Sequence, residues 1–214
     1  MGNAIGLLGG SFDPIHVGHL LLARAARDAL DLAEVRLIPA ARPWQKGELA
    51  APAEHRVRMI ELAIAGEPRL VVDRIELARG GPSYTIDTLR ALRAQLPDTP
   101  LVLVIGADQM QRLDTWREWR EIPRLAHIAV ARRNDAVLAL AWPLAEFYNE
   151  RWAPRLPATT AGSVVDLPMP PSDASATEIR ALLKQPPAAA RDARLAALVP
   201  PPVLDYIRAH RLYC

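Results

Sequence analysis

Two histidines, His16 and His19, stand three residues apart at the end of a glycine-rich segment, GGSFDPIHVGH, at residues 9–19. The two glycines that open the segment directly follow a short apolar run, so a ligand can approach the backbone there. A helix is expected to begin near Val17. The first N–H groups and the dipole of a helix attract anions, and side chains three apart share one side of it. These features together indicate a phosphate-binding site.

The histidines also have competing interpretations. A buried histidine is commonly a core residue bonded to backbone, although two in one glycine-flanked segment argue against this. His-x-x-His spacing also occurs in zinc sites, but zinc needs at least three protein ligands, and His55, His127 and His210 show no matching pattern. No protein metal site is therefore expected. The dinucleotide fingerprint G-x-G-x-x-G and the Walker lysine are both absent.

Short apolar runs alternate with longer amphipathic runs along the chain. Strands are expected at 4–8, 35–39, 70–77, 101–105, 127–131 and 163–167, and helices at 17–32, 53–65, 84–96, 175–184 and 202–211. Such alternation predicts a parallel sheet with helices on both faces. The expected fold is α/β, a Rossmann-like doubly wound and mainly parallel sheet with C-terminal helices. Residues 136–157 are expected to add a peripheral helix plus a loop, and a Pro/Ala-rich connection to separate the last two helices.

The order of these elements predicts where a ligand binds. In open α/β sheets, ligands lie beyond the carboxyl ends of the strands. The loops after Leu8, Pro39, Ile105 and Ala131 are therefore expected to face one site. With 214 residues, half of them apolar, the chain can form one domain with its own core, and a single domain over 1–214 is expected.

The composition argues against nucleic acid as a partner, against a membrane or secreted location, and against cysteine-based sites. The net charge of +2 gives no sign of a nucleic-acid-binding surface. No apolar run approaches the ~20 residues that cross a bilayer, and the N-terminus does not resemble a signal peptide. The one cysteine, Cys214, forms neither a disulfide framework nor a metal site. A soluble, cytoplasmic protein is expected, and its oligomeric state is not readable from the sequence.

A second polar segment, SATEIR at residues 175–180, lies near the C-terminus. Serine or threonine at a helix start caps the helix, and the next turn presents an arginine suited to phosphate. Alone, this segment would be an ordinary capped helix. Together with the histidine segment, and in this order, it resembles the HxGH nucleotidyltransferase superfamily, whose members transfer a nucleotidyl group from ATP or CTP.

Within that superfamily, the chain is most similar to the bacterial nicotinate-nucleotide adenylyltransferases over nearly its whole length. The segments that carry this narrower resemblance are PSYT at 82–85, IGAD at 105–108, Trp116, and the pair Arg132-Arg133 after a strand. Each has an ordinary structural explanation by itself, as a helix entrance, a strand end or a core tryptophan. Their joint order along the expected ligand edge is what favours the resemblance.

The resemblance implies transfer of an adenylyl group from ATP to nicotinate mononucleotide, giving nicotinate adenine dinucleotide and pyrophosphate. It implies His16 and His19 as the catalytic residues. It implies ATP-binding residues at Gly9, Gly10, Ser11, Phe12, Lys46, Gly106, Asp108, Ser175, Thr177 and Arg180. It implies binding of the mononucleotide by Tyr84, Thr85, Trp116 and Arg133, with Trp116 stacked on the pyridine ring. Mg²⁺ is expected to arrive with ATP, because no cluster of carboxylates suggests a protein cage.

Two departures from the family pattern and two alternatives remain open. The family often has Pro-Pro-His after the second strand, where this chain reads RPWQK at 42–46, and Arg117 stands where an aromatic residue is frequent. A phosphopantetheine adenylyltransferase shares both main motifs, although such enzymes are shorter and need neither Tyr84 nor Trp116. A non-catalytic nucleotide-binding protein would not need two histidines directed at phosphate. The preference for nicotinate over nicotinamide also stays open.

Overall fold

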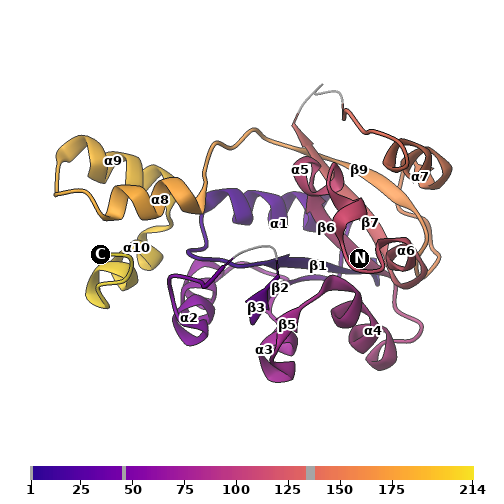
Figure 1. The fold of residues 1–214 in the computed structure, drawn as a ribbon, viewed down its shortest axis with the longest axis horizontal. Coiled ribbons are helices and arrows are strands. Elements are labelled where there is room, and N and C mark those ends of the chain that lie inside the picture. The colour runs from indigo at the N-terminus through magenta and orange to yellow at the C-terminus, as the bar shows by residue number, and fades with distance from the viewer. Residues whose placement is uncertain (1, 45–46, 134–137) are drawn as a thin grey trace.

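The computed structural model describes residues 2–44, 47–133 and 138–214, and it has helices on both faces of one large sheet (Figure 1). Seven strands pair in the order β4-β2-β1-β6-β7-β9-β8, and every pair is parallel. Their bounds are β1 Ile5–Gly10, β2 Glu34–Pro39, β4 Leu70–Val72, β6 Leu101–Gly106, β7 His127–Arg133, β8 Trp152–Ala153 and β9 Val164–Met169. A separate short pair joins β3 (Arg42–Pro43) to β5 (Pro82–Ser83). The expected doubly wound, mainly parallel sheet is confirmed.

The helices pack on both faces of this sheet. They are α1 Val17–Ala29, α2 Ala53–Ala63, α3 Ile75–Arg79, α4 Thr85–Gln95, α5 Ala107–Met110, α6 Ile122–Leu125, α7 Leu144–Arg151, α8 Ala176–Leu183, α9 Ala189–Leu198 and α10 Pro201–Ala209. Short 3₁₀ turns, η1 (Leu113–Thr115) and η2 (Trp119–Glu121), lie between α5 and α6. One core cluster holds residues of α1, α2 and the C-terminal helices, and the other holds residues of α4, α6 and α7.

The central strand β6 shows why its sequence is continuously apolar. Successive side chains of a strand point to opposite faces. Val102 and Val104 therefore enter the first cluster, while Leu101, Leu103 and Ile105 enter the second. A strand that is covered on both faces has no position for a polar residue, so the run ends only where the strand reaches Gly106.

The expected strand at 70–77 is wrong in its second half. The strand ends at Val72, and Ile75 begins the short helix α3. Asp73 causes the change: its carboxylate accepts a hydrogen bond from the backbone N–H of Ile75 at 2.9 Å and forms an ion pair with Arg36 of the neighbouring strand at 3.1 Å. Aspartate that bonds the backbone two residues on forms a turn, so the strand cannot continue.

The expected connection between the last two helices is also wrong, because it contains helix α9. The alanine-rich run from 188 to 197 has high helix propensity, and Leu195 and Leu198 of this helix are buried in the first core cluster. Prolines on both sides of the run suggest an irregular loop, but they lie outside the helix. The peripheral helix expected within 136–157 is present as α7, followed by the edge strand β8.

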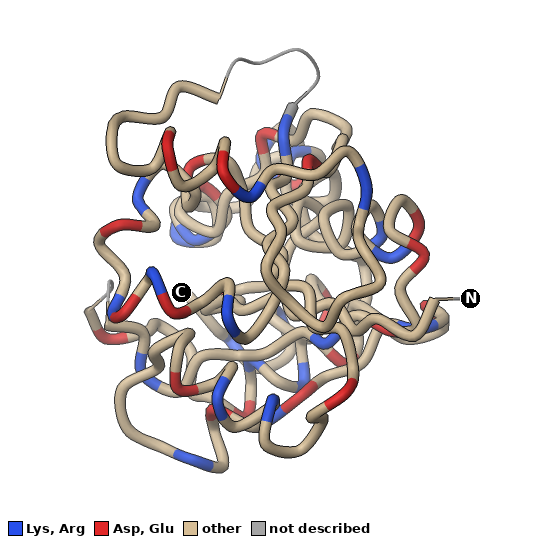
Figure 2. The backbone as a smooth tube through the Cα atoms, turned by 90° about the vertical axis from the view of Figure 1, so that its right-hand side faces the viewer, with Lys and Arg blue, Asp and Glu red and all other residues tan. Residues whose placement is uncertain are grey.

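Charged residues of both signs are interspersed along the chain (Figure 2). Among the helices that the structure describes, none is long and apolar enough to span a membrane.

Candidate active site

A cavity of about 370 Å³ opens at the carboxyl ends of β1, β2 and β6. Its lining includes Gly9, Gly10 and Ser11 after β1, Ala40 after β2, and Gly106 and Asp108 at the end of β6. Three of the four loops expected to face one site therefore do so. No described residue of β7 lines the cavity, and residues 134–137, which follow that strand, lie outside the described part of the chain. The volume is within the range of small-molecule sites.

The two histidines lie together at the start of α1. His19 lines the cavity, whereas His16 is buried, with 7% of its surface exposed. Their ring centroids are 3.7 Å apart. The backbone N–H of His16 donates to Nδ1 of His19 at 3.2 Å. A ring nitrogen that accepts a hydrogen bond carries no proton, so we assign the proton of His19 to Nε2, which can then donate to a phosphate oxygen in the cavity.

Phe12 supports His19 from the protein interior. It is buried, lies 4.9 Å from His19 between ring centroids, and is not among the residues that line the cavity. Its expected contact with ATP stays a prediction. Its backbone has a φ of 47°, a left-handed conformation that is uncommon for an aromatic residue. Its ring would lie 3.1 Å from a Cβ placed on Gly10. Glycine at position 10 therefore leaves room for the aromatic ring that packs against His19.

Gly18 leaves room for the ring of His16. A Cβ at this position would lie 3.1 Å from Nδ1 of His16 and 3.1 Å from Oγ of Ser172. Both distances are tighter than most contacts of a real Cβ. The loop before α8, which carries Ser172, therefore packs directly against the start of α1.

We expect Gly18→Ala to lower kcat about ten-fold or more, because the added methyl group displaces the His16 ring, and small displacements of reacting groups are costly. Alanine has the higher helix propensity, by about 1 kcal/mol, so the helix itself is not weakened. Gly47→Ala is the matched control, since a Cβ there meets nothing within 4 Å. Steady-state kinetics of both variants tests this, and equal kcat values would contradict the role given to Gly18.

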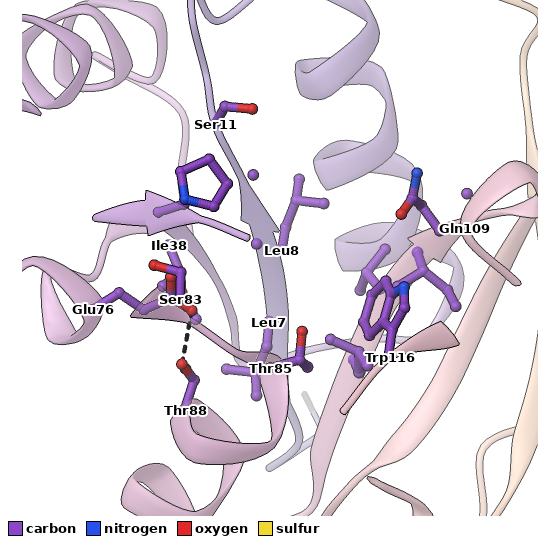
Figure 3. A pocket seen from close by; sticks show the side chains of 18 of the residues that line it. Leu7, Leu8, Ser11, Ile38, Glu76, Ser83, Thr85, Thr88, Gln109 and Trp116 are labelled. Carbon is purple, nitrogen blue, oxygen red and sulfur yellow. Dashed lines mark hydrogen bonds between the residues drawn. The ribbon is translucent and has the colours of Figure 1, made fainter. Parts of the chain in front are cut away.

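At the end of the cavity away from Ser11, Trp116 lies on one side and Glu76, Ser83 and Thr88 lie on the other, with Thr85 between them (Figure 3). Thr85 begins helix α4, whose first backbone N–H groups have no partner within the helix itself. Nε1 of Trp116 is buried and has no hydrogen-bond partner among the described residues. This end of the cavity therefore offers an aromatic surface and the start of a helix.

Sequence reasoning missed Glu76 at this end, and it placed Ser83 in the PSYT segment without its contacts to the loop after β2. Glu76 is buried and its Oε1 accepts a hydrogen bond from the hydroxyl of Thr88 at 2.7 Å. Oγ of Ser83 accepts from the backbone N–H groups of Ala41 at 2.9 Å and Arg42 at 3.3 Å. Ser83 therefore fastens the loop after β2 to the entrance of α4. Glu76 was missed because it falls within the region expected as a strand.

Tyr84 does not line the cavity but supports its wall. Its ring lies 6.2 Å from that of Trp44, which does line the cavity. The guanidinium of Arg117 lies 4.9 Å from the centroid of the Tyr84 ring, within the range of a cation–π contact. Arg117, which stands where the family often has an aromatic residue, thus packs against the ring of Tyr84 outside the cavity. Its guanidinium also lies 3.6 Å from the carboxylate of Glu118.

The C-terminal segment caps its helix as expected but lies outside the cavity lining. Oγ of Ser175 accepts from the N–H of Glu178 at 3.2 Å, and Thr177 is exposed. Nη1 of Arg180 donates to the backbone carbonyl of Asp13 at 2.7 Å, so this arginine holds the loop before His16. Ser175, Thr177 and Arg180 are next to the histidine segment rather than around the cavity, and their expected contact with phosphates stays a prediction.

Gly106 and Asp108 lie at the start of α5. A Cβ on Gly106 would lie 2.5 Å from Oδ1 of Asp108, so glycine allows the carboxylate to fold back over the strand end. Both residues line the cavity. Gln45 and Lys46 lie outside the described residues, and the side chain of Arg133 is not described. The expected contacts of Lys46 and Arg133 therefore stay predictions.

Within the described ranges, no group of three or more His, Cys, Asp or Glu side chains could hold a metal ion. The third ligand that zinc needs beside His16 and His19 is thus not found in that part of the chain.

A glycine-rich loop of the kind that binds phosphate lies at the first strand–helix junction of a parallel sheet, and a cavity opens beyond the strand ends. These two features define a nucleotide-binding α/β protein. The sequence model of the family described as Cytidylyltransferase-like matches residues 7–182. A relative from Bordetella petrii is 48% identical over 98% of each chain, and one from Chromobacterium violaceum is 44% identical over 100% of each. Both are described as probable nicotinate-nucleotide adenylyltransferases. The chain belongs to this family of nucleotidyltransferases, within the broader Cytidylyltransferase-like family.

A solved structure supports the fold. The Plasmodium falciparum nicotinic acid mononucleotide adenylyltransferase complexed with NaAD has a TM-score of 0.77 at 16% identity, and the match covers 99% of this chain and 97% of that one. The resemblance inferred from the sequence motifs is therefore confirmed at the level of the family and of the fold.

Proposed function

We propose that this chain joins nicotinate mononucleotide and ATP to give nicotinate adenine dinucleotide and pyrophosphate. The observation that carries the proposal is one cavity with two different ends. His19, whose ring lies against that of His16, lines the cavity together with Ser11 of the same segment. Thr85 and Trp116 line the end of the cavity away from Ser11 (Figure 3). A triphosphate needs the first kind of surface, and a pyridine ring with a carboxylate needs the second.

The proposed reaction is an in-line displacement at phosphorus. An oxygen of the 5′-phosphate of the mononucleotide forms a bond to the α-phosphorus of ATP, and the bond from that phosphorus to the α–β bridging oxygen breaks. The leaving group is pyrophosphate. A phosphate nucleophile is already ionised at neutral pH, so no general base is needed. Catalysis then rests on positioning and on stabilising charge in the transition state.

His19 is proposed to donate from Nε2 to an oxygen of the transferring phosphate. His16, whose ring centroid lies 3.7 Å from that of His19, is proposed to donate to a neighbouring α- or β-phosphate oxygen. Gly9, Gly10 and Ser11 are proposed to let the phosphates approach the backbone, and Asp108, which lines the cavity, is proposed to accept a hydrogen bond from a ribose hydroxyl. Lys46, Ser175, Thr177 and Arg180 are proposed to contact the β and γ groups. ATP is proposed to enter as its Mg²⁺ complex, since magnesium commonly binds through substrate phosphates and water.

At the acceptor end, Trp116 is proposed to stack on the pyridine ring. The backbone amides of Tyr84, which precedes α4, and of Thr85, which begins it, are proposed to receive the nicotinate carboxylate. Arg133 is proposed to contact the mononucleotide. A site built from backbone donors favours a carboxylate, because an amide needs an acceptor as well. We further propose that the protein acts in the cytoplasm, where an exposed thiol such as Cys214 remains reduced.

The proposal is tested by pyrophosphate release from ATP with three acceptors measured in parallel: nicotinate mononucleotide, nicotinamide mononucleotide and phosphopantetheine. We expect the highest kcat/KM with nicotinate mononucleotide. A higher value with phosphopantetheine would replace the proposed function by the alternative within the superfamily. Release with none of the three, from protein that binds ATP, would leave a nucleotide-binding protein without this activity.

We expect Trp116→Leu to raise the KM for nicotinate mononucleotide about five- to ten-fold and to leave the KM for ATP within two-fold. Leucine keeps part of the apolar bulk but loses the aromatic face, and aromatic stacking contributes about 1 kcal/mol beyond burial. Trp142→Leu is the matched control, because Trp142 is 78% exposed and does not line the cavity. If the KM for ATP rises instead, Trp116 contacts ATP, and its proposed stacking on the pyridine ring is wrong.

A further inference from the structure

Asp13, three residues before His16, is a buried carboxylate that connects distant parts of the chain. Its Oδ2 accepts from the N–H of Ala50 at 2.8 Å. Its Oδ1 accepts from the N–H of Ala51 at 3.1 Å and from the hydroxyl of Tyr213 at 2.8 Å. Its backbone carbonyl accepts from Arg180, as described above. Hydrogen bonds at Asp13 therefore connect the histidine segment (residues 9–19) to the loop before α2, to Arg180 of α8 and to Tyr213, which follows α10.

Arg56 of α2 holds the other side of the same loop. It is 1% exposed and donates to the backbone carbonyls of Ser11 at 2.7 Å, Ala40 at 2.8 Å and Ala51 at 3.2 Å. Burial lowers the pKa of this guanidinium, and the nearby charge of Asp13 opposes that shift. The buried carboxylate and guanidinium thus compensate one another while each bonds to backbone.

Tyr213 reaches Asp13 through a turn that follows helix α10. Helix α10 ends at Ala209, and the N–H of Leu212 turns back to donate to the carbonyl of Ile207 at 3.0 Å. Tyr213 then adopts a left-handed backbone with φ of 68°, which costs free energy in a non-glycine residue. Its side chain is nevertheless buried. Burial and the charge of Asp13 both raise the pKa of the Tyr213 hydroxyl, which therefore remains a donor at physiological pH.

We infer that Tyr213 is a positioning residue for adenylyl transfer: its hydroxyl fixes the carboxylate of Asp13 and thereby the backbone that carries His16 and His19. The inference rests on the proposed function for its kinetic readout. A purely structural role would need only the buried ring of Tyr213. The hydrogen bond from its hydroxyl to a loop that leads directly into the two histidines is what distinguishes the positioning role.

The test is Tyr213→Phe, with Tyr206→Phe as the matched control. Both changes remove one hydroxyl from the C-terminal part of the chain, but the hydroxyl of Tyr206 bonds to Nδ1 of His55 at 2.9 Å. At a temperature well below both melting transitions, we expect Tyr213→Phe to lower kcat about ten-fold. The KM for nicotinate mononucleotide should stay within two-fold, since the Trp116 end is untouched. Tyr206→Phe should stay within two-fold of the wild type in both constants.

A spectroscopic readout makes the inference independent of turnover. The chain has five histidines, so a ¹H–¹⁵N spectrum of their imidazole rings can be assigned by single substitutions. We expect Tyr213→Phe to shift the signals of His16 and His19, and Tyr206→Phe to shift those of His55. Unmoved signals of His16 and His19 in folded Tyr213→Phe would overturn the inference, whatever reaction the wild type catalyses.

The kinetic outcomes separate the two proposals. A kcat for Tyr213→Phe equal to that of Tyr206→Phe would overturn the positioning role, as would a loss that matches the unfolded fraction of the sample. A wild type that releases no pyrophosphate with nicotinate mononucleotide would overturn the proposed function, and the ring spectra would then decide the role of Tyr213. In an Asp13→Asn background, Tyr213→Phe should lower kcat by less than it does in the wild type, because the carboxylate that its hydroxyl fixes is already changed.

Discussion

Replacing His16 with alanine is expected to lower kcat about a hundred-fold or more while the protein stays folded. Removing one donor that stabilises charge in a transition state costs ~3 kcal/mol. His16 stands at the N-cap of α1, and losing an N-cap residue costs only about 1 kcal/mol of stability. The loss of turnover should therefore far exceed any loss of folded protein, as measured by pyrophosphate release at saturating substrates and by thermal melting.

His210→Ala is the control for His16→Ala, because His210 is exposed and its ring packs on Tyr206, away from the cavity. We expect its kcat to equal that of the wild type. His19→Ala should resemble His16→Ala, and the double variant should lose little more than either, since residues that act as a unit are not additive. Near-normal turnover of His16→Ala would remove this histidine from the proposed mechanism.

Arg56→Met is expected to lower the free energy of unfolding by about 3–5 kcal/mol, the cost of breaking a buried charged network. The change leaves three backbone carbonyls without their donor and leaves Asp13 as a buried carboxylate without the compensating guanidinium. Urea denaturation of the wild type and of Arg56→Met measures the difference in the free energy of unfolding. The urea concentration at the midpoint of unfolding should fall in the variant, whereas the dependence of the free energy on urea concentration should not change.

Arg58→Met is the control for Arg56→Met. Arg58 lies on the same helix, but it is exposed and pairs with Glu61 at 3.3 Å, and exposed ion pairs contribute about 0–1 kcal/mol. A loss in Arg56→Met no larger than that in Arg58→Met would show that the three carbonyls find other partners.

The first strand, the glycine loop and the helix start at Val17 were predictable because their signals are local. A short apolar run, two glycines and an amphipathic repeat lie within 29 residues of the N-terminus, and each has its own physical cause. The same holds for β6, whose apolar run predicts a strand buried on both faces. The position of the cavity followed from the order of strands and helices rather than from any one residue.

Other parts were not predictable because their causes lie far away in sequence. Helix α3 depends on Asp73, which pairs with Arg36 on a neighbouring strand. Arg56 bonds to Ser11, 45 residues away, and Tyr213 to Asp13, 200 residues away. An arginine or tyrosine in an amphipathic sequence gives no sign of such partners. Arg180 shows the same limit, since its motif predicts a contact with phosphate while its observed partner is a backbone carbonyl.

The transfer of the adenylyl group is the central claim, and ATP labelled at the α-phosphorus tests it most directly. With nicotinate mononucleotide as acceptor, we expect the label to appear in nicotinate adenine dinucleotide, in equal molar amount with unlabelled pyrophosphate. Label that remains in ATP, or that appears in free AMP without dinucleotide, would contradict the claim.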